Sequence, residues 1–133
     1  TSEISVAASN VAVIPEVRLK LVELQRKLAA DTDVIMDGRD IGTYVLPDAE
    51  LKIFLTATVE ERANRRCREL REKGVETDFE AVKKDMEYRD KNDSGREFAP
   101  LKPAEDSVYM DNTDMTLEES IDKVCELARA ERE

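Results

Sequence analysis

The sequence predicts an α/β fold in which helices cover a parallel β-sheet. Three short apolar runs, Val34–Met36, Leu51–Leu55 and Val108–Met110, have the length of buried strands. Segments with helical periodicity lie around and between them, and this alternation is typical of parallel sheets covered on both faces. The 133 residues are enough for one domain with a sizeable core.

The first two helices have clear start signals. Pro15 can occupy the first position of a helix. The apolar face of that helix contains Val17, Leu21, Leu24 and Leu28. Thr58, followed three residues later by Glu61, forms a capping box for a second helix. That helix is predicted to reach about Lys73, because Gly74 is a typical helix stop.

Two further helices follow. Asp78 can cap a third helix, which carries Phe79, Val82 and Met86. Thr116 and Glu119 form a second capping box. The apolar stripe of this last helix contains Leu117, Ile121, Val124, Cys125 and Ala128.

Composition excludes several classes of function. The net charge of -10 argues against general binding of nucleic acids or anionic membranes. The absence of histidine removes His-based acid–base catalysis, Ser-His-Asp triads and most zinc sites. Cys67 and Cys125 are predicted to be reduced core thiols of a cytoplasmic protein. No apolar run reaches the length needed to span a membrane.

The first charged cluster, "DGRDIG", follows the first predicted strand. Ligands of open α/β sheets bind at the carboxyl ends of strands, where this cluster would lie. Arg39 could bind a phosphate through two hydrogen bonds, and Asp37 could hold magnesium directly or through water. Gly38 and Gly42 would let the backbone approach a ligand closely. A turn with local ion pairs explains this cluster equally well when it is considered alone.

The second cluster lies in "YRDKNDSGREFAPL". Arg89, Asp93 and Arg96 are spaced so that a continuous helix would place them on one face. Gly95 is expected to end the helix before Arg96 and to leave that residue on a loop. A solvated helix face with i,i+4 pairs is the alternative, and it is favoured if the cluster stands alone.

The third cluster, "ERANRRCREL", gathers Arg62, Arg65, Arg66 and Arg68 on one predicted helix. Like charges at helical spacing repel one another mildly, and an anionic partner would relieve the repulsion. The alternative is a solvated face neutralised by neighbouring glutamates.

Together, the clusters resemble the bacterial-type cytidylate kinase (CMP kinase) family. The matching stretches are "DGRDIGTYVLPDAELKIFLTATVEERANRR", "DFEAVKKDMEYRDKNDSGREFAPLKPAEDSVYMDNTDMTLEESI" and, more loosely, "ASNVAVIPEVRLKLVELQR". The resemblance implies a P-loop kinase-like, three-layer α/β/α fold with a parallel sheet and a helical lid, incomplete at the N-terminus. ATP would donate its γ-phosphoryl group to CMP or dCMP, with Mg²⁺.

The resemblance also implies an organisation of residues 1–133 as the C-terminal portion of one kinase domain. The expected parts are the end of the CMP-binding region with a core helix (1–30), core strands (31–60), the lid (61–96), and a core strand with the C-terminal helix (97–133).

Individual roles follow from the matched motifs. Arg39 would bind the CMP phosphate, Asp40 the cytosine amino group, and Arg18 the cytosine ring. Ser9 would line the same nucleoside site. The remaining acceptor residues would be Arg89 and Asp93, directed to the ribose, and Arg96, at the transferring phosphates. Arg39, Arg89 and Arg96 would therefore be catalytic.

On the donor side, Arg62, Arg65 and Arg66 resemble the lid arginines over ATP. Asp111, Asn112 and Thr113 resemble the loop near the adenine.

The chemistry of cytosine agrees with these roles. A carboxylate can accept a hydrogen bond from the N4 amino group, and an arginine can donate to N3 and O2. Uracil carries an acceptor at position 4 and would face Asp40 unfavourably. Because a mismatched base leaves polar groups unpaired, such a site discriminates well. Phosphoryl transfer then needs mainly positioning and positive charge.

One expected motif is missing from the sequence. A phosphate-binding loop reads G-x-x-x-x-G-K-[ST], and none of Gly38, Gly42, Gly74 and Gly95 fits that pattern. The family places this loop, and the first strand, before the point where the sequence starts. We therefore expect this chain alone to be an inactive part of a cytoplasmic kinase that is monomeric when intact, and that associates with its own N-terminal segment.

Two alternatives stay open. One is a related P-loop kinase with another acceptor, and the other is a non-catalytic, acidic helical interaction module.

Overall fold

The computed structural model describes residues 11, 14–95 and 99–131. Its sheet consists, within these residues, of β1 (Ile53–Thr56) and β2 (Val108–Asp111). The strands are parallel, with Ile53 opposite Val108 and Thr56 opposite Asp111. The predicted α/β class and parallel pairing are confirmed.

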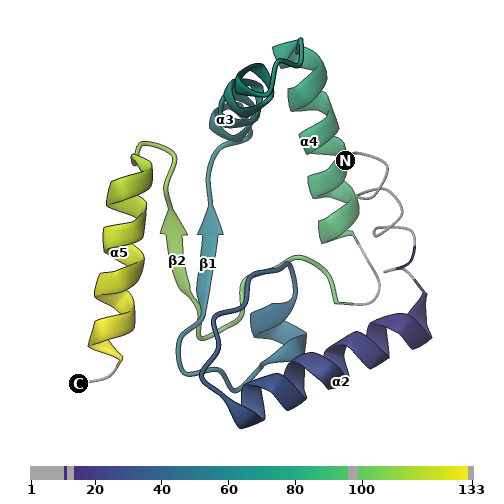
Figure 1. Ribbon diagram of the computed structural model, residues 1–133, viewed down its shortest axis with the longest axis vertical. Coiled ribbons are helices and arrows are strands. Elements are labelled where there is room, and N and C mark those ends of the chain that lie inside the picture. Colours follow the sequence, from purple (N-terminus) through teal and green to yellow (C-terminus); the bar gives the residue numbers. More distant parts are fainter. Residues whose placement is uncertain (1–10, 12–13, 96–98, 132–133) are drawn as a thin grey trace.

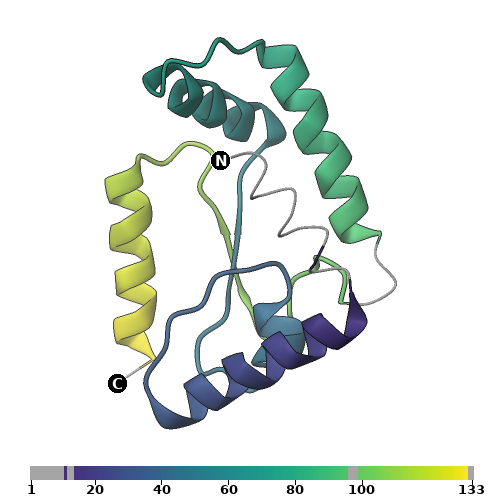
Figure 2. The same ribbon diagram turned by 45° about the vertical axis from the view of Figure 1, so that its right-hand side comes forward.

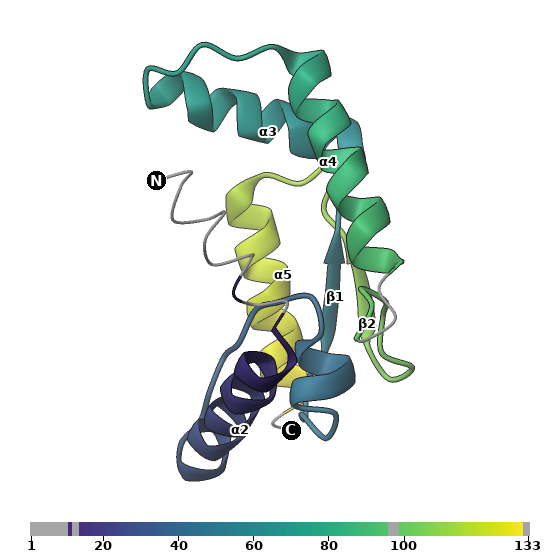
Figure 3. The same ribbon diagram turned by 90° about the vertical axis from the view of Figure 1, so that its right-hand side faces the viewer.

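Helices surround this short sheet (Figure 1). They are α2 (Pro15–Asp31), the π-helical turn η1 (Ile41–Val45), α3 (Val59–Glu72), α4 (Phe79–Ser94) and α5 (Leu117–Ala130). The α3–α4 hairpin lies at one end of the molecule and α2 at the other (Figures 1 and 3), while α5 stands on the β2 side of the sheet in the view of Figure 1. From its start at the far end, α4 runs down toward the end that α2 occupies (Figure 2).

The capping residues begin the helices as predicted. The full capping box forms at α5, where the Thr116 hydroxyl accepts from the Glu119 amide and the Glu119 carboxylate accepts from the Thr116 amide at 2.8 Å. At α3 the Thr58 hydroxyl accepts from the Glu61 amide at 3.3 Å. The Glu61 carboxylate instead accepts from Arg65. Only half of that capping box is therefore made.

The predicted strand at Val34–Met36 is wrong. This segment is irregular, and the Ile35 side chain is fully exposed, at 103%. A strand needs a neighbouring strand to receive its hydrogen bonds, and among the described residues β1 pairs with β2 alone. An apolar run of three residues does not show whether a neighbouring strand is available.

The predicted apolar face of α2 is also wrong in part. The buried residue of α2 is Val22, on the side that contacts η1. Leu21, Leu24 and Leu28 are about half exposed. This helix is apolar on two sides, so periodicity alone could not choose which side packs against the rest of the chain.

The two cysteines differ. Cys67 is buried on α3, as predicted, and its Sγ lies 3.5 Å from the Thr77 hydroxyl. Cys125 is exposed, which corrects the prediction of a core thiol, because no residue of α5 is buried. The core of the described residues is accordingly small, and its apolar members are Val22, Val45, Ala57, Ala63, Cys67 and Met110.

Candidate nucleotide site

The candidate site centres on Arg39 and Asp40, in the loop between α2 and η1. Arg18 of α2 forms an ion pair with Asp40, and Arg39 forms one with Asp93 near the end of α4. Four predicted acceptor residues from three separate segments thus converge. Asp37, the predicted magnesium ligand, is exposed in the same loop.

Two carboxylates of this cluster are buried. Asp40 is 8% exposed and Asp93 is 6% exposed. A buried carboxylate is costly unless a cation and hydrogen bonds compensate it, so each is matched by an arginine. The Arg39 side chain remains 44% exposed, and its guanidinium is accessible to an anion from solvent.

Gly38 is tightly packed against Ile41, so a side chain at position 38 would displace that neighbour. A Cβ at this position would lie 2.9 Å from the Ile41 side chain. The corresponding distance at Gly42 is 3.4 Å, to the Lys52 side chain. Both glycines therefore adjoin side chains of this chain, and the close approach of a ligand to them stays a prediction.

The segment after Asp40 is fixed to α2 by Arg26. The Arg26 Nε donates to the Val45 carbonyl at 2.8 Å and Nη2 to the Tyr44 carbonyl at 2.6 Å, with the guanidinium 5.6 Å from the Tyr44 ring centre. The Asp40 carbonyl accepts from the amides of Tyr44 and Val45. Arg26 thus supports the loop that carries Arg39. Sequence reasoning missed it, since an arginine on an exposed helix gives no signal of such a contact.

The other predicted acceptor residues are placed unevenly. Arg89 is on α4, one turn before Asp93, and is exposed. The two share a helix face, as their spacing predicts. The helix ends at Ser94, with Gly95 as its C-cap, so the predicted stop is confirmed. Ser9 and Arg96 lie outside the described residues.

The predicted lid arginines all lie on α3, and each pairs with a carboxylate. Arg62 binds Asp90 on α4, Arg65 binds Glu61, and Arg66 binds Glu69. Arg65 is the one whose contacts include the loop after β2. Its Nη1 donates to the Asn112 side-chain oxygen at 3.0 Å and its Nη2 to the Asn112 carbonyl at 2.7 Å.

That loop borders a hollow at the carboxyl ends of β1 and β2. The hollow has a volume of about 420 Å³ and is lined by Thr58, Asp111, Thr113, Asp114 and Met115. The Thr113 hydroxyl donates to Asp111 at 2.6 Å and accepts from the Thr58 amide at 2.9 Å. The Thr113 amide also donates to Asp111, at 2.9 Å. The two hydrogen bonds from Thr113, one from its hydroxyl and one from its amide, lower the pKa of Asp111. This edge of a parallel sheet is where ligands of α/β proteins bind.

A buried lysine supports the opposite end of β1. Lys52 is 9% exposed, and its Nζ donates to the Pro47 carbonyl and, at 2.5 Å, to Asp106. The hydrogen bond from Lys52 lowers the pKa of Asp106. In the sequence, Lys52 is a charged residue within the apolar run that predicts a strand. The structure explains it by placing the side chain inside and starting the strand one residue later.

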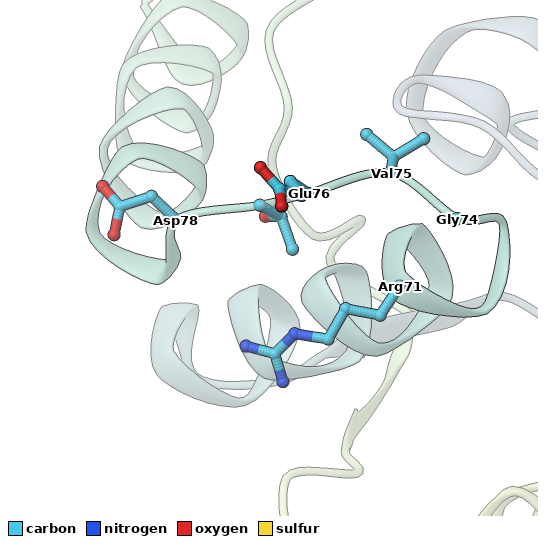
Figure 4. Close-up of a pocket in the computed structure, with 6 residues that line it drawn as sticks. Arg71, Gly74, Val75, Glu76 and Asp78 are labelled. Carbon is cyan, nitrogen blue, oxygen red and sulfur yellow. The ribbon is translucent and has the colours of Figure 1, made fainter.

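None of the predicted site residues that the structure describes lines a second, larger hollow. It measures about 710 Å³, at the turn between α3 and α4, and is lined by Arg71, Gly74, Val75, Glu76, Thr77 and Asp78. Arg71 extends along α3 below the linking segment, while Asp78 stands at the start of α4 (Figure 4). The Asp78 carboxylate caps α4 by accepting from the Ala81 amide at 3.2 Å. The hollow is open and belongs to the tip of the hairpin.

Two further findings concern metals and membranes. Among the residues that the structure describes, no group of three or more histidine, cysteine, aspartate or glutamate side chains is arranged to hold a metal ion. None of the helices within the described ranges is long and apolar enough to cross a membrane.

Comparison with known proteins found similarity to one family. A sequence model of the cytidylate kinase family matches residues 1–130. The cytidylate kinase of Caldicellulosiruptor saccharolyticus is 59% identical over 124 residues, which cover 93% of this chain and 55% of that protein. The cytidylate kinase of Caldicellulosiruptor bescii is 55% identical over 94% of this chain and 55% of its own length. The cytidylate kinase of Streptococcus pneumoniae (strain Hungary19A-6) is 54% identical over 92% of this chain and 55% of its own length. The chain spans about half the length of the curated relatives it matches.

Proposed function

The chain belongs to the cytidylate kinase family, and from this premise we propose that its residues recognise the acceptor in transfer of the ATP γ-phosphoryl group to CMP or dCMP. The products are CDP and dCDP. The observation that carries the proposal is the meeting of Arg39, Asp40, Arg18 and Asp93 at one loop, although they come from three segments. A phosphate-binding cation and a base-reading carboxylate stand next to each other there.

The acceptor residues divide the work. Arg39 binds the phosphate of the acceptor, because its guanidinium is accessible and presents a planar set of donors. Asp40 accepts from the cytosine amino group, and Arg18 holds that carboxylate in place while donating to the ring. Arg89 and Asp93 bind the ribose from α4, and Ser9 and Arg96 complete the acceptor site. The chemical step relies on this positioning and on positive charge around the transferring group.

The donor side is proposed to lie at the carboxyl ends of β1 and β2. The hollow between Thr58 and Met115 adjoins Asn112, the predicted adenine loop, and Arg65 connects that loop to α3. Arg66 is proposed as a further contact to ATP; for Arg62 the family resemblance alone suggests this role.

Magnesium fits Asp37 as a single protein ligand. Mg²⁺ is commonly held by one or two carboxylates together with substrate phosphates and water, and Asp37 is an exposed carboxylate of the acceptor loop. The bound ion would supply neutralisation of phosphate charge.

We propose further that a polypeptide limited to these 133 residues does not make CDP. The 133 residues contain no G-x-x-x-x-G-K-[ST] motif, and a P-loop kinase binds the phosphates of ATP through that motif. The proposal includes a cytoplasmic enzyme that acts as a monomer.

Steady-state assays test the proposal at two levels. A complete kinase polypeptide, in which these residues are joined to a phosphate-binding loop, should use CMP and dCMP in preference to UMP. A preference for UMP or for a non-nucleotide acceptor would count against the acceptor assignment. Failure of CMP to raise the melting temperature would favour a non-catalytic module. The 133-residue polypeptide should form no CDP, and robust CDP formation would refute the need for a phosphate-binding loop of that pattern.

A further inference from the structure

Arg62 is bound on three sides within the described part of the chain. Its Nη1 and Nη2 donate to the two carboxylate oxygens of Asp90, at 3.0 and 2.5 Å. Its Nε donates to the Ala57 carbonyl at 3.0 Å. Each nitrogen of the guanidinium is therefore a donor to a protein oxygen. The hydrogen bonds to Asp90 raise the pKa of Arg62, which keeps the cation charged.

These contacts connect the sheet to the helix that carries acceptor residues. Ala57 directly follows β1, at the carboxyl end of the sheet, and it is buried. Asp90 is on α4 between Arg89 and Asp93. A bidentate arginine–carboxylate pair fixes direction as well as distance. The Ala57–Arg62–Asp90 chain thus sets where the last turns of α4 stand relative to the sheet.

A second attachment of these turns is at the acceptor loop, through the ion pair of Asp93 with Arg39. Asp90 and Asp93 are three residues apart and pair with arginines of two different segments. The final turns of α4 are therefore held between the end of β1 and the acceptor loop. A substitution of Asp90 would therefore shift the positions of Arg89 and Asp93, even though Asp90 itself contacts no nucleotide in this proposal.

We propose that Asp90 is a positioning residue for the acceptor site and that it acts through Arg62. This inference rests on the proposed function, because it assigns the positioned residues to the acceptor nucleotide. It also gives Arg62 a different part from the one that family resemblance suggests. Arg62 holds α4, and its loss affects the use of CMP more than the use of ATP.

The hairpin offers a matched control at Glu60. Glu60 of α3 pairs with Lys83 of α4 at 2.7 Å, so it also joins the two helices. This pair lies nearer the start of α4, and the side-chain bond to the Ala57 carbonyl comes from Arg62 and not from this pair. Glu60→Gln removes one charge from an α3–α4 ion pair, as Asp90→Asn does, while leaving the connection to the sheet in place.

The test measures KM for both substrates in the complete kinase. Asp90→Asn and Arg62→Ala should each raise KM for CMP about five- to tenfold, the range expected when a partly exposed, charge-assisted contact is lost. KM for ATP should change less than about twofold, within the range of a neutral surface change. Glu60→Gln should leave both constants at their wild-type values. The double variant of Arg62 and Asp90 should resemble the single ones, because two residues that act as a unit are not additive.

Three results would overturn the inference. One is a raised KM for ATP in Arg62→Ala together with an unchanged KM for CMP in Asp90→Asn. That result would mean that Arg62 binds ATP directly. Another is an equal effect of Glu60→Gln on CMP, which would mean that general weakening of the hairpin is responsible. The third is full additivity of the two substitutions.

Amide hydrogen exchange tests the positioning role of Asp90 independently of the proposed function. Asp90→Asn should speed exchange in residues 89–93, and Glu60→Gln should not, whether or not the protein turns over CMP. Equal exchange in the two variants would overturn the positioning role. Absence of CMP turnover by the wild-type enzyme would instead contradict the proposed function.

Discussion

The sharpest prediction concerns Asp40→Asn, because the structure dictates how the new amide must lie. Arg18 donates to Asp40 Oδ2 and has no acceptor to offer. An asparagine at this position must therefore turn its oxygen to Arg18 and its NH₂ group toward the ligand. The NH₂ group would then meet the cytosine amino group, donor against donor, whereas uracil presents an acceptor at the same place. Asp40→Asn is expected to shift the preference of the enzyme toward UMP.

The magnitude follows from the burial of this site. Asp40 is 8% exposed, so a mismatched polar group near it cannot be fully rehydrated. Leaving one such group unsatisfied costs about 1–3 kcal/mol. Since every 1.4 kcal/mol is about tenfold, kcat/KM for CMP should fall by about five- to 150-fold. The gain of a matched contact to UMP acts in the opposite direction, so the CMP/UMP ratio should fall by at least about tenfold.

The assay compares kcat/KM for CMP and UMP in the complete kinase, with Asp33→Asn as the control. Asp33 is exposed and undergoes the same charge change, so its CMP/UMP ratio should equal that of the wild type. The melting temperature of Asp40→Asn reports the loss of the charged contact with Arg18. An unchanged CMP/UMP ratio with an intact fold would refute the reasoning and place cytosine recognition elsewhere.

Further predictions concern a phosphate contact, a buried cation and a titrating cap. Arg39→Ala should raise KM for CMP by at least about tenfold, as expected for loss of a charge-assisted phosphate contact; equal loss of melting temperature and activity would indicate a purely structural ion pair. Lys52→Met, which keeps the length of the side chain, should leave the free energy of unfolding nearly unchanged, because the exposed carboxylate of Asp106 is easily rehydrated; chemical denaturation measures this, and a large loss of stability would contradict it. Hydrogen bonds from Thr116 lower the pKa of Glu119 below its ordinary value, so the contribution of this carboxylate to stability is present above the ordinary pKa and is lost as the pH falls through the lowered pKa. Glu119→Gln should therefore destabilise the protein at pH 7 and lose this effect in acid, and a difference in unfolding free energy that does not vary with pH would exclude the carboxylate as the cause.

The helix ends predicted from local signals are confirmed. Thr116 and Gly95 act at the helix ends where the sequence places them, because a cap depends on residues within one turn. The strand at Val34–Met36 was wrong because a strand depends on a distant partner. The side of α2 that packs was wrong for a similar reason, since Val22 is chosen by its contact with η1.

The candidate site shows the same division. Residue types and spacing single out Arg39 and Asp93, but the pairing of one with the other spans more than fifty residues and needs the fold. Arg26 gave no signal, because its partners are backbone carbonyls. A pattern of side chains in the sequence cannot show which carbonyls are free to accept.

The attachment of the acceptor loop has a consequence for protein engineering. Residues 32–40 belong to no helix or strand, and the position of Arg39 and Asp40 depends on side chains of α2 and α4. A transplant of "DGRD" alone into another kinase scaffold would carry the recognition groups without the counter-ions that orient them. The transferable unit is a set of paired positions, in which Arg18 must travel with Asp40 and Asp93 with Arg39. Changes of base preference are therefore best made by exchanging such pairs together.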